Sequence, residues 1–185
     1  MSEKEKMIES QIREIYGRVV YTHKTHEKCA DLLKKRSDGL KITEILLSGL
    51  TTTSILVIIF GDGCLFQFLA ALFSTALLCL TLYSKDFNLL ALAEKHKQAA
   101  LDVLEIREEL LSLLVDIKIG NKPIEHFQTK RDELNARLVN TYRGAPKTIY
   151  KAYQIASKAL KENEEFTFSD EEIDKFLPES LRKIK

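Results

Sequence analysis

The sequence predicts an all-α membrane protein, in which a transmembrane helical hairpin is joined to long cytoplasmic amphipathic helices that form a helical stalk or bundle. Two apolar runs, residues 45–60 and 64–84, contain no charged side chain and are joined by only Gly61-Asp62-Gly63. The segments on either side carry apolar residues at the three- and four-residue spacing of an α-helix. No alternating strand pattern is longer than residues 166–168.

The two apolar runs have the length and composition of membrane spans. At 1.5 Å per residue the second run forms a helix of roughly 30 Å, about the thickness of the bilayer's hydrocarbon core. Its ten Leu and Phe residues each favour insertion by about 0.3 to 0.6 kcal/mol, which outweighs the cost of Gln67 near one end. The first run reaches full length if Ile42 and Thr43 join it. The alternative, a hairpin buried in a soluble core, is disfavoured by this segregation of charge.

Composition points to two solvents. Charged residues make up 30% of the chain, yet none falls in either apolar run, and the net charge of +1 argues against a general nucleic-acid binder. About forty charged and polar residues precede the first run, so no cleavable signal peptide is expected. Cys29, Cys64 and Cys79 lack paired or metal-ligand spacing and are expected to be thiols. Cys64, near the hairpin tip, could pair only with its copy in another chain.

Charge also predicts the orientation of the hairpin. Lysine and arginine flank both spans, whereas the connecting turn carries only Asp62. The positive-inside rule therefore places both termini in the cytoplasm and the turn outside. The flanking basic residues are Lys34, Lys35, Arg36, Lys41 and Lys85.

Two long cytoplasmic helices are predicted, over residues 3–36 and 86–119, with a stop or bend at Ser37-Asp38-Gly39. Both leave the same membrane face, so we expect them to run alongside each other as a stalk. Their apolar faces are wider than one partner helix covers, which predicts a homo-oligomer. The first stripe is Ile8, Ile12, Ile15, Val19, His26, Ala30 and Leu33, widened by Tyr16, Val20 and Tyr21. The second is Leu90, Ala93, Ala100, Leu104, Leu111 and Val115, widened by Leu89, Leu92, Leu101, Leu110 and Leu114.

Two more helices and a short one are predicted toward the C-terminus. Breaks at Gly120–Pro123 and Gly144–Pro146 bound a helix over 124–142, with apolar Ile124, Phe127, Leu134, Leu138 and Tyr142, and one over 147–163, with apolar Ile149, Tyr150, Tyr153, Ala156 and Leu160. Ser169 and Glu172 form a capping box for a short helix that ends before Pro178. The expected organisation is therefore an N-terminal helix (1–40), the hairpin (41–85), a cytoplasmic helical region (86–163) and a charged tail (164–185).

One cluster, His23, His26, Glu27 and Cys29, has residue types that bind metals. Its order, His-x-x-His-Glu, matches neither zincin pattern, and the same residues serve as polar and packing positions of an amphipathic helix. No nucleophile elbow, phosphate-binding loop or dinucleotide fingerprint occurs. We therefore predict no catalytic residue, no metal site and no cofactor, and a protein that is not an enzyme.

The spans carry polar residues on helical stripes, and two explanations remain open. Small and hydroxyl side chains allow close helix packing in lipid. Alternatively, they line an aqueous path once several copies assemble, because two helices cannot enclose a pore. The candidate pore-lining residues are Glu44, Ser48, Thr51, Thr52, Gln67, Ser74 and Thr81.

The layout resembles the SLATT family of two-transmembrane proteins that accompany nucleotide-signal synthases in bacterial conflict systems. The resemblance rests on the hairpin, the helices that flank it and the run from Glu14 to Lys28, EIYGRVVYTHKTHEK, and covers about residues 5–160. It implies a pore-forming or membrane-disrupting effector of antiphage defence and abortive infection in the bacterial inner membrane. A cytosolic partner would signal to it, either a nucleotide second-messenger synthase or a reverse transcriptase system, or the nucleotide or nucleic-acid product of one. The rival hypothesis is a non-conducting, membrane-anchored scaffold that recruits a partner through its cytoplasmic helices.

Overall fold

The computed structural model describes residues 3–60 and 64–183, and its regular secondary structure is entirely helical. The predicted all-α fold is confirmed, and residues 166–168 form no strand. The connecting residues 61–63, on which the predicted turn falls, lie outside the described residues. The elements are α1 (Glu3–Phe60), α2 (Cys64–Asp86), α3 (Leu89–Ile119), α4 (Ile124–Gly144), α5 (Tyr150–Lys161), α6 (Asp170–Phe176) and the 3₁₀ turn η1 (Glu179–Leu181).

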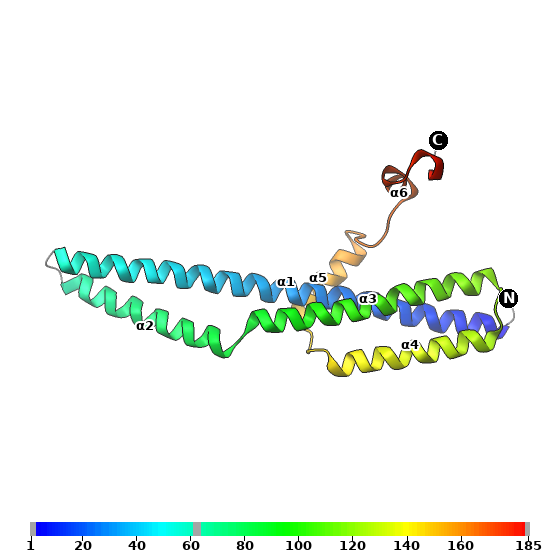
Figure 1. The fold of residues 1–185 in the computed structure, drawn as a ribbon, viewed down its shortest axis with the longest axis horizontal. Helices are drawn as coiled ribbons and strands as arrows, with labels where there is room; N and C mark the ends of the chain where they lie inside the picture. The colour runs from blue at the N-terminus through cyan, green and yellow to red at the C-terminus, as the bar shows by residue number, and fades with distance from the viewer. Residues whose placement is uncertain (1–2, 61–63, 184–185) are drawn as a thin grey trace.

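The first helix, α1, runs the length of the molecule (Figure 1). It pairs with α2 in the hairpin at one end and with α3 and α4 in the stalk at the other. The predicted stop or bend at residues 37–39 is therefore wrong. Gly39 costs a helix at most about 1 kcal/mol, and the packing of α1 against both α2 and α3 on either side of this point outweighs that cost.

The opposite side of the molecule does contain a break, which the sequence analysis missed. We predicted a helix from Asp86 to Ile119, but α2 ends at Asp86 and α3 begins at Leu89. The Asn88 side chain caps α3 by accepting a hydrogen bond from the Ala91 backbone N–H at 2.9 Å. Next to this break, the Arg36 guanidinium donates a hydrogen bond to the Tyr83 hydroxyl at 2.9 Å and so ties α2 to α1.

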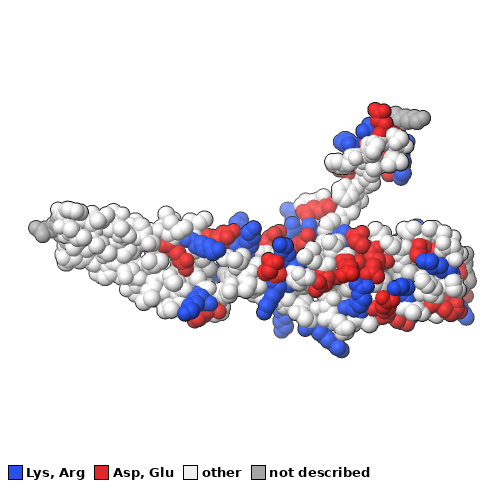
Figure 2. Space-filling view, in the orientation of Figure 1, with Lys and Arg blue, Asp and Glu red and all other residues white. Residues whose placement is uncertain are grey.

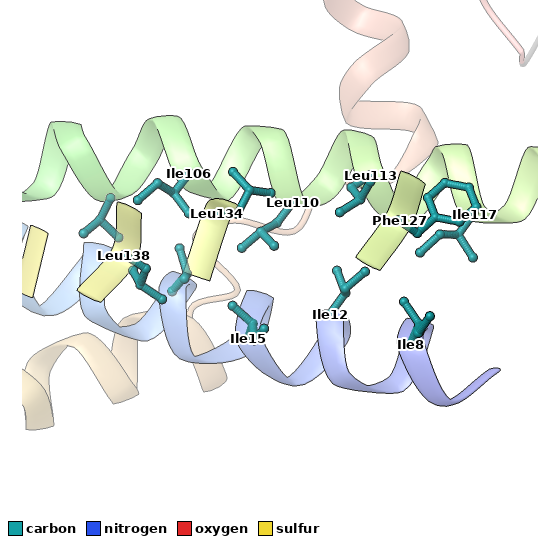
Figure 3. Close-up of a cluster of buried hydrophobic side chains, with 12 residues drawn as sticks. Ile8, Ile12, Ile15, Ile106, Leu110, Leu113, Ile117, Phe127, Leu134 and Leu138 are labelled. Atoms are coloured by element: carbon teal, nitrogen blue, oxygen red, sulfur yellow. The ribbon is translucent and has the colours of Figure 1, made fainter. Parts of the chain in front are cut away.

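The stalk has a continuous apolar core between α1, α3 and α4 (Figure 3). Ile12, Val19, Val103 and Leu110 are completely buried in it. The prediction that the two long helices lie alongside each other is confirmed. The core consists of Ile8, Ile12, Ile15, Val19, Val103, Ile106, Leu110, Leu113, Ile117, Phe127, Leu134 and Leu138.

Only part of the predicted stripe on α3 is buried. Leu90, Leu111 and Val115 are 46%, 44% and 51% exposed, whereas the buried face runs through Val103 and Leu110. Because leucines also lie beside the buried face of α3, periodicity alone could not select the face that meets α1. The remaining apolar face has no partner within the described part of this chain.

The helices after α3 differ in how they meet α1. Phe127, Leu134 and Leu138 of α4 are buried as predicted, whereas Tyr142 is 41% exposed. In α5 the buried face is a row of alanines, which includes Ala156 of the predicted apolar set, whereas Ile149, Tyr150 and Tyr153 of that set are exposed. Short alanine side chains allow the α5 backbone to approach α1 closely and leave the tyrosines outside. The buried alanines are Ala152, Ala156 and Ala159.

The short C-terminal helix forms as predicted. The Ser169 hydroxyl accepts a hydrogen bond from the Glu172 backbone N–H, and the Glu172 carboxylate accepts one from the Ser169 backbone N–H. Helix α6 then ends at Phe176, before Pro178. In Figure 1 this helix stands away from the other five.

Candidate functional site

The hairpin of α1 and α2 presents an almost uncharged surface (Figure 2). Its large apolar side chains point outward, with Ile45 70%, Phe60 86% and Phe68 65% exposed. The apolar stretches of both helices are long enough to cross a membrane, and almost none of their residues is buried. Exposed side chains of this kind require lipid rather than water as their solvent.

The contact between α1 and α2 is a narrow seam. Its residues recur at intervals of three and four, the pattern of two helices that pack along one stripe. Ser54 is the most buried of them, at 6% exposed, and it was not among the predicted site residues. The seam contains Leu40, Glu44, Leu47, Thr51, Ser54 and Ile58 of α1 and Leu69, Ala70, Phe73, Leu77, Leu80 and Ser84 of α2.

The predicted polar residues divide into two groups. Glu44 and Thr51 are half-buried in the seam, and both serve the packing of α1 against α2. The others are exposed on the outside of the hairpin, where they pack against nothing in this chain. This exposed group is Ser48, Thr52, Gln67, Ser74 and Thr81, and we call it the polar side of the hairpin.

The polar side is one surface rather than two. Each residue advances a helix by about 100°, so Ser48 and Thr52 lie roughly a quarter-turn past the centre of the α1 seam. Ser74, with Gln67 and Thr81 seven residues before and after it, lies roughly a quarter-turn past the α2 seam in the same rotational sense. Because the two helices are antiparallel, equal rotations lead to the same side of the hairpin. The opposite side is lined by Leu46, Leu50, Val57, Leu65 and Leu72.

Hydrogen bonding distinguishes residues within this surface. The Thr52 hydroxyl donates to the Ser48 carbonyl at 2.9 Å and the Thr51 hydroxyl to the Leu47 carbonyl at 2.8 Å, which allows both to lie in apolar surroundings. Gln67, Ser74 and Thr81 form no side-chain hydrogen bond to any described residue. Placing an amide or hydroxyl without a hydrogen-bond partner in lipid costs up to several kcal/mol of free energy. These side chains therefore favour contact with water or with another copy of the chain.

Two polar atoms are buried in the seam near the basic ends of the spans. The Glu44 Oε1 and the Ser84 Oγ are shielded from solvent and have no hydrogen-bond partner among the described residues. An unpaired carboxylate oxygen in an apolar seam destabilises the contact that encloses it. The Glu44 oxygen is therefore a group that this packing leaves unsatisfied, and Ser84 is a position that sequence reasoning missed.

The residues of metal-binding type on α1, for which no metal site was predicted, do not converge on one point. All three of His23, His26 and Cys29 are buried, but each meets a different neighbour. The Nδ1 atoms of His26 and His96 are 2.9 Å apart, His23 stacks on Phe166 with ring centroids 5.5 Å apart, and Cys29 bonds to the Ile149 backbone. Among the described residues no group of three or more metal-binding side chains forms.

Burial governs the ionisation of these histidines. Desolvation, followed by repulsion from His96 and His23, lowers the pKa of His26 to about 4. Desolvation also lowers the pKa of His96. The pair is therefore neutral near pH 7, with one imidazole donating its proton to the other. His96 was missed because it is a single polar residue within an otherwise apolar α3 face, and that position was its only signal.

Beside the histidines, the chain after α5 is anchored to the stalk. Phe166 lies under two cations, with the Lys24 Nζ 4.6 Å and the Arg107 Cζ 4.7 Å from its ring centroid. The Lys24 Nζ also bonds the Glu165 carboxylate at 2.6 Å and Glu27 at 3.0 Å. Burial lowers the pKa of Lys24, but these two hydrogen bonds more than offset it, so the pKa is raised and Lys24 is a cation.

The structure thus combines a hairpin of two candidate membrane-spanning helices with a packed helical stalk. The chain belongs to the SMODS and SLOG-associating 2TM effector domain family 4 (SLATT_4), whose family model matches residues 8–172. The resemblance noted from the sequence is thus confirmed, and its family is one of membrane effectors. Neither the search of curated proteins nor that of solved structures gives a match.

Proposed function

We propose that this protein is an antiphage effector that assembles as a homo-oligomer in the bacterial inner membrane and opens a pore lined by the polar side of the hairpin. A signal from a cytosolic defence partner acts on the cytoplasmic helices. The family membership supports the effector role in a defence system. The pore, the oligomer and the partner are our extension of it.

The observation that carries the pore is that five polar residues gather on one side of the hairpin and leave the other side apolar. A hairpin that is only an anchor in lipid has no use for such a division. In a ring of hairpins the polar sides face a common axis, and the leucine-lined sides face lipid or neighbouring hairpins. Glu44, half-buried beside this surface, would reach the cytoplasmic mouth when the seam opens and would favour cations there.

The proposed topology has its own test. A phosphatase fused after Lys185 should be inactive and one inserted at Asp62 active, because the basic residues flanking the spans stay in the cytoplasm. The reverse pattern would contradict the orientation on which the pore depends.

Membrane potential, recorded in bacteria that express the protein with its signalling partner, tests the pore. The chain offers matched controls, because Thr52 and Thr53 are neighbours on different sides of α1, as are Ser74 and Thr75 on α2. Thr52→Leu with Ser74→Leu should abolish depolarisation while expression and oligomer mass stay unchanged. Thr53→Leu with Thr75→Leu, which changes hydroxyls off the polar side, should depolarise normally.

Two outcomes would contradict this proposal. Equal depolarisation by both pairs of variants would leave the polar side without a role in conduction. Loss of the oligomer in the first pair alone would mean that these hydroxyls pack helices together, as in the alternative that the protein is a non-conducting scaffold. The scaffold is favoured by one observation, the exposed aromatic residues on α5, but it does not account for the polar side.

A further inference from the structure

The C-terminal arm, residues 167–183, is an ordered module that exposes apolar side chains. It stands away from α1–α5 (Figure 1), and Phe168, Phe176 and Leu181 are 64%, 85% and 64% exposed. Its shape is fixed from within, since the Lys183 backbone N–H bonds the Asp174 carboxylate and the Lys183 ammonium lies 2.9 Å from Asp170. Apolar groups held outward on a fixed module form a contact surface.

The base of this arm is fixed to the stalk, which limits where the arm can reach. Phe166 and Glu165 are held by Lys24 and Arg107. From that anchor the chain leads away from its own α1 and α5. The arm therefore extends into the space outside its own chain.

A groove of about 560 Å³ between α1 and α5 fits an aromatic residue of such an arm. Gly17 lies in it, and a Cβ built there meets no atom within 4 Å. Tyr21 and Tyr153 have ring centroids 6.1 Å apart, and Tyr150 extends the aromatic surface with 73% exposure. The groove is lined by Arg13, Glu14, Gly17, Arg18, Tyr21, Thr22 and Tyr153.

Charge matches the arm to this groove. Residues 143–161, which include α5, carry five basic and no acidic side chains, whereas the arm, residues 167–183, carries five acidic and three basic ones. Two arginines and one glutamate line the groove itself, Arg13, Arg18 and Glu14, so its charge is positive by one. The ion pairs of Arg13 with Glu9 and of Arg18 with Glu14 are exposed and long, at 3.7 and 3.9 Å. Opposite charges on the two surfaces select this pairing and its orientation.

We propose that the C-terminal arm of one copy docks in the α1–α5 groove of the next copy, with Phe176 as its apolar anchor. The contact is head-to-tail, so that each copy gives its arm to one neighbour and receives an arm from the other, and the assembly closes as a ring. The inference rests on the proposed homo-oligomer and names the cytoplasmic contact that joins its subunits.

Cross-linking between two differently tagged populations tests this contact. Both carry Cys64→Ser and Cys79→Ser, and full-length chains with Lys175→Cys, which keeps the Phe176 anchor, are co-expressed with chains that carry Tyr150→Cys instead. Mild oxidation should give a disulfide-linked species that contains both tags. Failure to form it would overturn the inference. A chain that carries both introduced cysteines is a further test. If its disulfide forms only within one chain, the arm folds back onto its own groove and the inference is also overturned.

Variants of the groove make the cross-link test specific. Gly17→Trp fills the groove and should lower the cross-link yield by roughly tenfold, as expected for a central contact residue, whereas Gly17→Ala should leave it unchanged. Equal yields from both would overturn the inference. Glu171→Lys on the arm and Arg18→Glu in the groove should each lower the yield and together restore it. If the two reversals do not compensate, the proposed pairing is wrong.

Oligomer mass in mild detergent separates this inference from the proposed function. A full chain that remains oligomeric but gives no mixed cross-link would refute the arm contact alone. A full chain that is monomeric at micromolar concentration would refute both.

Discussion

The stalk and the hairpin share one helix, α1, yet they are built in opposite ways. In the stalk the seam between α1 and α3 is apolar over the part that contains Ile12 and Leu110, both fully buried, and its buried polar contact is the His26–His96 pair nearer the hairpin. Most of the charged residues are outside. In the hairpin the seam contains Glu44, Thr51 and Ser54, and the largest apolar side chains are outside. One continuous helix thus changes its pattern near residue 40, where its solvent is expected to change.

The comparison shows that different forces hold the two halves. The stalk is held by removal of apolar surface from water, which contributes about 25 cal/mol per Å². Lipid provides no such force between α1 and α2, so close packing and small residues hold them together. Core substitutions should therefore unfold the stalk and leave the hairpin formed.

The largest effect is expected from Leu110→Ala in the stalk core. Leu110 is fully buried, so the substitution should lower the free energy of unfolding of the stalk by about 2 to 5 kcal/mol. Leu111→Ala, one residue along and 44% exposed, should cost much less. Chemical denaturation of both variants in detergent, followed by circular dichroism, measures the difference. Equal losses would mean that the stalk does not pack as described.

Acid should weaken the stalk through its buried histidine pair. His26 has a pKa of about 4 in the folded protein and an ordinary value near 6.5 when unfolded, so the unfolded chain binds more protons between these values. The contribution of neutral His26 to the free energy of unfolding is fully present above about pH 7 and is lost as the pH falls toward 4. The loss is about 3 kcal/mol, at 1.36 kcal/mol per pKa unit.

Unfolding at pH 7.5 and pH 5 checks this acid sensitivity. The titratable groups that face His26 are His96 and His23. The charged groups that face His23 are Glu27, Arg107, Lys24 and Glu108. His26→Gln should reduce the difference in stability between the two pH values, whereas His126→Gln, on α4, should not. An unchanged difference in the first variant would assign the acid sensitivity to other groups.

A smaller pair of effects should distinguish the two chain paths between stalk and hairpin. Asn88→Ala removes the cap of α3 and should destabilise the protein by about 1 kcal/mol. Gly39→Ala, in the unbroken helix opposite, should stabilise it by up to about 1 kcal/mol, since the added methyl group meets no atom within 4 Å. The midpoint of thermal unfolding should fall for Asn88→Ala and rise for Gly39→Ala. Destabilisation by Gly39→Ala would indicate that α1 bends there.

The smallest effect is expected at the stalk surface. Arg137 pairs with Glu105 at 3.2 Å and with Glu109, and its side chain is 35% exposed. Because solvent screens such pairs, Arg137→Met should change the stability of the stalk by no more than about 1 kcal/mol, and less at high salt. A loss as large as that of Leu110→Ala, measured in the same denaturation, would contradict the view that burial holds the stalk.

Sequence reasoning found what periodicity and composition determine. It gave the spans, the stalk and the capping box, since each depends on a local pattern. It failed where several local solutions were equally good, because Leu111 and Leu110 are equally apolar and only the position of α1 decides between them. It also failed at Gly39 and Asn88, because tertiary packing decided which of two weak helix-breaking signals took effect. Sequence reasoning also could not distinguish Thr51 from Thr52. Only the position of α2 shows that Thr51 lies in the seam and Thr52 is exposed.

The unbroken course of α1 has a mechanical consequence. Fifty-eight residues make a rod of roughly 87 Å at 1.5 Å per residue, and a helix of this kind resists torsion. The azimuth of Ser48 and Thr52 is therefore locked to that of Ile12 and Val19, far away in the stalk. A rotation of the stalk part of α1 about its long axis should therefore rotate the hairpin part of α1 by a similar angle, whereas the break between α2 and α3 interrupts such coupling on the other side.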